Sequence, residues 1–417
     1  KMFKKQTAKA GEVTPLQALT TALAATVGTG NIAGITFAIT LGGPGSIFWL
    51  WVSALLGMAT KYSEVLLSVK FRERNILGDW VGGPMYYIKN GLGKNWKWLG
   101  AVFCVFGGLA SFGIGNAVQV GEITSAVNTA IRSFVPSAME HEMVINIVLA
   151  VILMAIIGVV LVGGIKRIGE VTEFMVPIMS VIYIVACLLV IGANITRVPH
   201  VFGMIFQGAF TPEGVSGGVA AITIKTCIEW GVKRGVFSNE AGLGSAPIAH
   251  AATSETNPVK QGLYGIFEVF MDTIVICTLS GLTLLLALDA ETINYGIKGT
   301  TALNAQALGT VLGGKTGALI IAIGLSLFAL STVLSWGLYG TRCWEYLLGE
   351  KAVKPYQIIF TLVVIISATM DLSLAWAIAD TLNGLMAIPN LIGLLLLCPV
   401  VFKMTREYFD SERRLRK

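Results

Sequence analysis

Apolar stretches long enough to cross a lipid bilayer recur along the whole of this 417-residue chain. A helix rises about 1.5 Å per residue, so about 20 apolar residues cross the roughly 30 Å hydrocarbon core. Backbone amides find no water in that core, and a spanning segment must therefore be a helix or part of a closed barrel. The stretches here are continuous rather than alternating, which indicates helices. The sequence predicts an all-α membrane protein in a lipid bilayer.

The composition supports this class. Charged residues make up 13% of the chain and hydrophobic residues 54%, whereas a soluble domain carries roughly 25% charged residues. We expect about ten spans of suitable length. They lie near residues 15–40, 44–70, 98–132, 143–165, 171–194, 214–232, 262–288, 316–347, 356–370 and 373–403.

Two stretches between these spans are not expected to cross. Residues 196–212 predict an amphipathic segment at the outer surface. Residues 236–258 are polar and rich in glycine, and they predict a cytoplasmic loop, with partial re-entry as the alternative. The last span contains Pro389, which predicts either one kinked helix or two short pieces.

The distribution of basic residues sets the expected orientation. With the N-terminus inside, most of the 30 lysines and arginines fall in cytoplasmic segments. An even number of spans then places both ends of this sequence in the cytoplasm, and the expected location is the cell membrane. The net charge of +6 therefore reflects topology. No basic stripe with interleaved aromatic residues predicts a nucleic-acid partner.

Catalytic chemistry is not predicted. The six cysteines show no CxxC spacing and the three histidines are scattered, so neither a disulfide frame nor a zinc site is expected. An enzyme needs converging nucleophile, base or metal-binding groups, and no such cluster is visible. No ring-forming channel filter is visible either. The chain is therefore not expected to be an enzyme.

The first span contains a glycine-rich motif, AATVGTGNIAG, over residues 24–34. Its Gly-x-Gly pattern loosely matches a dinucleotide fingerprint, but no strand precedes it and no acidic residue follows at the required spacing. Two interpretations remain open: close helix packing through glycines, or a helix broken in mid-membrane. A break exposes amides suited to a carboxylate and carbonyls suited to Na⁺. The residues concerned are Gly28, Thr29, Gly30 and Asn31.

Polar residues in the third and eighth spans are further candidates. Ser331 and Thr332 offer adjacent hydroxyl oxygens, which are hard ligands suited to a small cation, although such hydroxyls often bond only the carbonyl four residues back. Trp336 shares a helix face with Thr332 and either walls a small pocket or packs elsewhere. Asn116 and Gln119 share a face of the third span, and they either line a pocket or hold helices together.

A second glycine-interrupted span is expected at residues 214–231, with Thr223 and Thr226 as its polar wall. Interrupted helices at matching positions of two halves point to an inverted-repeat binding site. Asp272 and Asp380 are intramembrane carboxylates that either carry a proton, ligate Na⁺ or form structural ion pairs.

Three motifs resemble a known family. Residues 20–73 include ALAATVGTGNIAGITFAITLGGPGSIFWLWVSALLGMATKYSE, residues 82–93 read GGPMYYIKNGLG, and residues 236–252 read VFSNEAGLGSAPIAHAA. Together they are similar to the alanine/glycine:cation symporter family, and most closely to prokaryotic sodium/alanine symporters. The resemblance extends over most of the chain. Family members have one further helix before the region where this sequence starts.

The resemblance implies a fold and an activity. It implies one transmembrane domain of the leucine-transporter type, an inverted repeat of five plus five helices with spans 1 and 6 broken. The repeats are expected near residues 14–195 and 213–403. The implied activity is Na⁺-coupled symport of alanine or glycine by alternating access. A proton-coupled carrier using Asp380 or Asp272 is the alternative.

The resemblance also implies roles for particular residues. The motif from Val27 to Asn31 is similar to the break of the first core helix, where backbone amides hold the substrate carboxylate. The Na⁺ ligands implied in this fold class are the carbonyls of Ala24 and Val27 and the hydroxyls of Ser331 and Thr332. Asn31 matches an asparagine that serves a second ion in some members.

Overall fold

The computed structural model describes residues 8–9, 11–211 and 222–415. Among these residues, seven helices are long and apolar enough to cross a membrane, and the bent pair α1 and α2 makes an eighth candidate. Helix α3 and the pair α11 and α12 occupy the places of the two other expected spans. The only strands in the described part are β1 and β2, which pair antiparallel with Glu73 opposite Val81.

The first half of the chain contains one broken span, one span with a π-helical turn, and one hairpin. Its elements are α1 (Pro15–Thr26), η1 (Thr29–Asn31), α2 (Ala33–Gly42), α3 (Ser46–Lys70), β1 (Glu73–Arg74), β2 (Trp80–Val81), α4 (Pro84–Gly91), η2 (Lys94–Trp96), α5 (Lys97–Phe112), η3 (Gly113–Ala117), α6 (Val118–Phe134), η4 (Pro136–His141), α7 (Glu142–Val162), α8 (Gly164–Ala193), η5 (Ile195–Arg197) and α9 (Val198–Phe210).

The second half begins with another interrupted span and ends with the longest helix. Its elements are α11 (Ile224–Asn239), α12 (Ala246–His250), α13 (Pro258–Val269), η6 (Phe270–Cys277), α14 (Thr278–Ala287), α15 (Ala290–Ile293), α16 (Thr301–Leu312), α17 (Gly314–Leu348), η7 (Glu350–Ala352), α18 (Val353–Thr369) and α19 (Leu372–Leu415). The last expected span is thus one helix, with Pro389 and Pro399 inside it.

The first span is broken where the sequence predicts. Thr14 and Gln17 form a capping box that starts α1. The helix ends at Thr26 because the backbone of Val27 and Gly28 leaves the helical region, and a short 3₁₀ turn at 29–31 leads into α2. The two halves are bent by 55°. Gly28 donates its N–H to the Asn31 side chain at 2.8 Å, which partly satisfies the interrupted backbone.

The structure shows a break of the sixth span after α11, at residues 240–245, while the glycines at 214–218 that predicted a break lie outside the described residues. Residues 236–258 are therefore not a surface loop, and the buried turn within them agrees with the alternative of partial re-entry. Helix α11 continues to Asn239, and the chain turns through Glu240 (φ 55°), Gly242 (φ 89°) and Gly244 (φ 81°) before α12. Glycine tolerates such positive φ angles at no steric cost. Residues 237–253 are all buried. Their polar groups bond to side chains of neighbouring spans, which removes the objection that the segment is too polar to lie inside.

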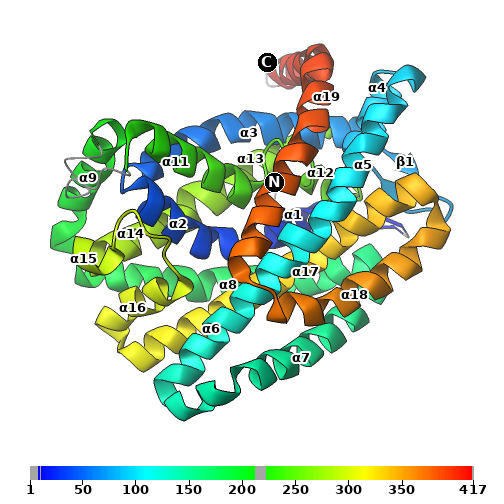
Figure 1. Ribbon diagram of the computed structural model, residues 1–417. Coiled ribbons are helices and arrows are strands. Elements are labelled where there is room, and N and C mark those ends of the chain that lie inside the picture. The colour runs from blue at the N-terminus through cyan, green and yellow to red at the C-terminus, as the bar shows by residue number, and fades with distance from the viewer. Residues whose placement is uncertain (1–7, 10, 212–221, 416–417) are drawn as a thin grey trace.

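The two interrupted spans face each other in the middle of the bundle. Helix α1 packs against α12, and α2 packs against α11. We call the half of the molecule that contains α1 and α12 the α1 side, and the half that contains α2 and α11 the α2 side. Figure 1 shows α9, α15 and α16 gathered at one end of the bundle, and β1 and α4 at the other.

Of the short helices α9 and α16, the sequence predicts only the first. The expected amphipathic segment at 196–212 contains helix α9, which packs against α3 through a hydrogen bond from the Trp49 indole to the Ala209 carbonyl at 3.2 Å. Helix α16 was not anticipated. It packs against α17 and α14, and its Thr301 hydroxyl donates to Glu122 in α6 at 2.5 Å.

Candidate functional site

The break of the first span meets helix α17 at a cluster of oxygen atoms. The Thr332 hydroxyl lies 2.9 Å from the Ala24 carbonyl and 3.0 Å from the Phe328 carbonyl. The Ser331 hydroxyl lies 3.3 Å and 2.8 Å from the same two carbonyls. Both side chains are buried. Val27, at the end of α1, is also buried.

This arrangement answers the question that the sequence left open for Ser331 and Thr332. Both hydroxyls bond to the Phe328 carbonyl in their own helix, and both also reach across to α1. A hydroxyl has acceptor lone pairs as well as a proton, so it can turn its oxygen toward a cation. The Phe328 carbonyl was not anticipated, because a backbone oxygen leaves no mark on the identity of its residue.

The α2-facing part of the break is lined by polar groups from η1 and the third span. The Thr29 N–H donates to Gln119 Oε1 at 3.4 Å, and the Gln119 amide donates to the Ile114 carbonyl at 2.9 Å. That carbonyl lies in the π-helical turn η3. The Thr29 hydroxyl is buried with no hydrogen-bond partner among the described residues. The break therefore presents a free hydroxyl beside backbone amides and an amide side chain.

Trp336 and Asn116 have different partners. The Trp336 indole donates to Glu240 Oε1 at 2.8 Å, so it joins α17 to the break of the sixth span. Asn116 faces away from that region. Its side chain donates to the Phe360 carbonyl at 2.8 Å and accepts from Ser367 at 2.8 Å, both in α18. Of the two interpretations of Asn116, the structure favours helix-to-helix bonding.

Thr223 and Thr226 are not brought to the break. They cap each other at the start of α11, and Thr223 is exposed. A helix of this length places its two ends roughly 20 Å apart. The residues of α11 that meet η1 are Phe237 and Ser238, whose atoms would lie 3.2 and 3.3 Å from a Cβ added at Gly30. The polar run Ser-Asn-Glu followed by Gly-x-Gly was the signal for this second break.

Asp272 links the two breaks. It lies in the π-helical segment η6 and is fully buried. Its carboxylate accepts from the Asn31 amide at 2.6 Å and from the hydroxyls of Ser238 at 2.9 Å and Thr273 at 2.7 Å. No lysine, arginine or histidine of the described residues forms an ion pair with it. A buried carboxylate without a counter-ion favours a proton or a metal cation.

A buried arginine lies on the α2 side, close to the break. Arg234 in α11 binds Asp380 in α19 at 2.7 Å, and its side chain is only 2% exposed. Lys233 binds the same carboxylate at 2.9 Å. Four rings surround the guanidinium, with centroids 4.8 to 5.8 Å from its central carbon. We call Phe37, Trp230, Phe237 and Trp376 the aromatic cage.

We expect Asp380→Ala to lower the melting temperature of the purified protein clearly. Arg234 would keep a buried charge without its ionic partner, and breaking such a pair costs about 3 kcal/mol or more. The matched control is Lys233→Ala, because Lys233 binds the same carboxylate but is 38% exposed. An exposed pair contributes about 1 kcal/mol or less. Equal melting temperatures for the two variants would contradict the structural role of Arg234.

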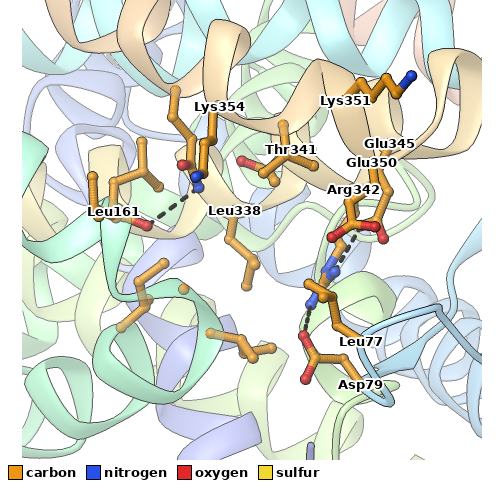
Figure 2. Close-up of a pocket in the computed structure, with 16 residues that line it drawn as sticks. Leu77, Asp79, Leu161, Leu338, Thr341, Arg342, Glu345, Glu350, Lys351 and Lys354 are labelled. Atoms are coloured by element: carbon orange, nitrogen blue, oxygen red, sulfur yellow. Dashed lines mark hydrogen bonds and ion pairs between the residues drawn. The ribbon is translucent and has the colours of Figure 1, made fainter.

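A cavity of about 420 Å³ lies apart from the breaks, between the α7–α8 turn, α17 and α18. Figure 2 shows Arg342 between two carboxylates at one side of this cavity. It binds Asp79 at 3.0 Å and Glu345 at 2.7 Å. These ion pairs hold the segment after β1 against α17. None of the residues named at the breaks lines this cavity.

Known proteins resemble this chain over nearly its whole length. The sodium/alanine symporter AgcS of Methanococcus maripaludis is 48% identical over 406 residues, covering 97% of this chain and 86% of that protein. An uncharacterized transporter of Haemophilus influenzae is 44% identical over 413 residues, covering 98% and 86%.

A solved structure resembles the fold. MhsT in complex with L-phenylalanine superposes with a TM-score of 0.63 at 13% identity, covering 92% of this chain and 89% of that chain. It confirms the leucine-transporter-type fold with broken first and sixth spans. The model of the sodium:alanine symporter family matches residues 1–417. The chain therefore belongs to the sodium:alanine symporter family and is a multi-pass membrane transporter, not an enzyme.

Proposed function

We propose that this chain couples the inward flow of Na⁺ to symport of a small neutral amino acid, alanine or glycine, by alternating access. The observation that carries the proposal is the meeting of two interrupted helices with the oxygen cluster of α17. Amides and carbonyls released from the helical ladder suit a zwitterion and a cation together, and the amides of Gly28 and Thr29 would exchange their present side-chain partners for the substrate carboxylate. Na⁺ and substrate bound together stabilise an occluded state, so the Na⁺ gradient does the work.

The proposed Na⁺ site consists of oxygen atoms only, as a hard cation requires. Its ligands are the carbonyls of Ala24 and Val27 and the hydroxyls of Ser331 and Thr332. The convergence of both hydroxyls on Ala24 supports this set. The Phe328 carbonyl, which both hydroxyls also contact, is an additional ligand.

The proposed substrate site is the α2-facing part of the break. The amides of Gly28, Thr29 and Gly30 bind the substrate carboxylate, and Asn31, Gln119 and Trp336 complete the wall. Little room exists for a large side chain. A Cβ at Gly28 would lie 2.5 Å from the Thr332 hydroxyl oxygen and 3.3 Å from Gln119 Oε1. This crowding supports a small substrate over a bulky one.

We propose that the α1 side faces the cytoplasm, that both described ends lie there, and that the protein resides in the cell membrane. Most basic residues then lie inside, as the positive-inside rule requires. The repeats proposed near residues 14–195 and 213–403 form one domain. The two sides have separate closures. Arg234 and Asp380 close the α2 side, and Arg72 holds the chain after α12 on the α1 side.

The Arg72 closure uses backbone oxygens. Its guanidinium donates to the carbonyls of Ala251 at 2.9 Å, Thr253 at 2.6 Å and Glu255 at 3.0 Å. Burial lowers the pKa of Arg72 to about 10, which still leaves it charged at neutral pH. A path from the substrate site to the cytoplasm requires these three bonds to break.

Proton coupling through Asp272 is the second candidate, because this buried carboxylate bonds to both breaks and lacks an ionic partner among the described residues. Asp380 suits that role less well, since it is engaged by Arg234 and Lys233.

The experiment that separates the two candidates is uptake of labelled alanine by proteoliposomes. We expect accumulation when an inward Na⁺ gradient is imposed at equal pH on both sides, and little uptake with a pH gradient alone. Competition by unlabelled glycine and by larger amino acids measures the size limit. Uptake driven by the pH gradient without Na⁺ would overturn Na⁺ coupling in favour of protons.

A further inference from the structure

A second group of charged side chains lies on the α1 side of the sixth-span break. Lys61 and Glu64 come from α3, Glu240 from the break itself, and Glu268 from α13. All four are at most 1% exposed. His250 of α12 bonds to Glu268 at 3.1 Å. We call Lys61, Glu64, Glu240 and Glu268 the buried charge cluster.

The buried charge cluster has more carboxyl groups than cations. Lys61 forms an ion pair with Glu268 at 3.3 Å, and its charge also acts on Glu64 and Glu240. Within the described chain no second lysine or arginine pairs with these carboxyl groups. One ammonium therefore faces three carboxyl groups in a dry interior. Uncompensated charge there is strongly unfavourable, so at least one carboxyl group must be neutralised.

His250 does not balance the buried charge cluster. Its Nδ1 lies 2.9 Å from the Gln261 side-chain amide, and its Nε2 lies 3.1 Å from Glu268. Even with a charged His250, three carboxyl groups would face only two cations.

Glu64 and Glu268 have the surroundings of carboxylate anions. One Glu64 oxygen accepts from the Gly242 and Gly244 amides at 3.1 Å each and from the Asn390 amide at 2.6 Å. Successive backbone amides of this kind stabilise an anion. Its second oxygen is fully buried and has no hydrogen-bond partner among the described residues. A proton on that oxygen would therefore have no acceptor to bond to. Glu268 is held ionised by Lys61 and by the N–H of His250.

Glu240 differs, because one of its partners can accept a proton. One carboxyl oxygen accepts from the Trp336 indole at 2.8 Å, and the other bonds to the Ser245 hydroxyl. A hydroxyl is donor or acceptor as required, so Ser245 can accept from a protonated Glu240. We propose that Glu240 is a proton-binding site and that it carries its proton while the breaks are closed to water.

This proton site would act within the proposed transport function. The site itself does not rest on that function, and only its effect on substrate binding does. Glu240 binds Trp336, which we place in the wall of the substrate site. Water that enters from the α1 side can hydrate Glu240 and take up its proton, and closure requires a proton to return from bulk water. The charged or titratable groups that act on Glu240 are Lys61, Glu268 and Tyr339. Glu64 in turn acts on Lys61, and His250 bonds to Glu268.

Infrared difference spectroscopy of the purified protein tests the site without reference to transport. We expect a carboxylic-acid band that is insensitive to moderate pH, is lost in Glu240→Gln and persists in Glu268→Gln. Gln keeps both hydrogen bonds of Glu240 and has no proton to lose. A carboxylic-acid region of the spectrum that is unchanged in Glu240→Gln would overturn the proposal, whereas bands from other protonated carboxyl groups are expected in every variant. Should that variant fail to fold, Ser245→Ala is expected to shift the band, and an unshifted band would overturn it equally.

Alanine binding as a function of pH tests the consequence. With saturating Na⁺, we expect the affinity of the intact protein for alanine to fall at high pH by up to about tenfold per pH unit, the limit for one linked proton. Glu240→Gln is expected to bind alanine without this decline. An identical decline in the variant would show that protonation of Glu240 does not affect alanine binding. Absence of Na⁺-driven uptake would refute the proposed function, while the infrared result would still decide the proton site.

Discussion

Gly28→Ala is expected to lower Na⁺-dependent alanine uptake strongly. The backbone of Gly28 (φ −138°, ψ −149°) is extended and accessible to any residue, so the effect does not come from backbone strain. It comes from space. The added methyl group would lie 2.5 Å from the Thr332 hydroxyl oxygen, where the proposed Na⁺ ligands meet the proposed substrate amides. Overpacking of this kind costs roughly 1–3 kcal/mol, which corresponds to a loss of roughly 5- to 150-fold in affinity.

Gly34→Ala is the matched control for this substitution. Gly34 lies in α2, just after the same break, and its added methyl group would be 3.6 Å from the Arg234 side chain, an ordinary contact. We expect near-normal uptake. Both variants are to be compared at equal levels of folded protein, judged by size-exclusion chromatography. Normal uptake by Gly28→Ala would show that neither ligand binds beside this residue.

Thr332→Ala is expected to raise the Na⁺ concentration for half-maximal uptake by roughly ten- to a hundredfold. The substitution removes one of two hydroxyls that contact the Ala24 carbonyl. Interactions with a charged group contribute about 1.5–3 kcal/mol each, which gives this range. Uptake is to be measured over a wide series of Na⁺ concentrations at fixed alanine. Thr332→Ser retains the hydroxyl and is expected to stay close to the original Na⁺ dependence.

Ser335→Ala is the control that tells whether Thr332 binds Na⁺ or only joins two helices. The Ser335 hydroxyl also crosses from α17 to α1, where it donates to the Thr21 carbonyl at 2.8 Å, but it lies outside the proposed ligand set. We expect its loss to leave the Na⁺ dependence unchanged. A similar shift for both alanine variants would mean that Thr332 holds the helices together and does not bind Na⁺.

Much of the fold was accessible from the sequence because the bilayer restricts the solutions. Long apolar runs specify helices, and the VGTGN motif specified the first break. The glycines at 214–218 lie outside the described residues, and the break that the structure shows in the sixth span uses Glu240, Gly242 and Gly244. Its polarity suggested a surface loop. Only the surrounding structure supplies the partners, such as Glu64, that let such a segment lie inside.

The sequence likewise predicts some residues of the candidate site and misses others. Ser331 and Thr332 stand out in the sequence as mid-span hydroxyls, and the structure brings both to the Ala24 carbonyl at the break. That they bind Na⁺ stays a prediction. Lys61 and Glu64 lie three residues apart in α3, a spacing at which two side chains of one helix can pair. In the structure Lys61 pairs with Glu268, a contact between distant segments that spacing along one helix does not contain.

The prolines inside α19 give that helix mechanical properties unlike those of its neighbours. Proline has no N–H, so the carbonyls of Leu385 and Leu395 lack their usual helical donors at positions 389 and 399. Bending at these points breaks no backbone bond. Asp380, which binds Arg234, precedes the first of them, and Asn390, which binds Glu64, follows it. The two ends of α19 can therefore tilt separately, while Asp380 stays bound to Arg234 and Asn390 stays bound to Glu64.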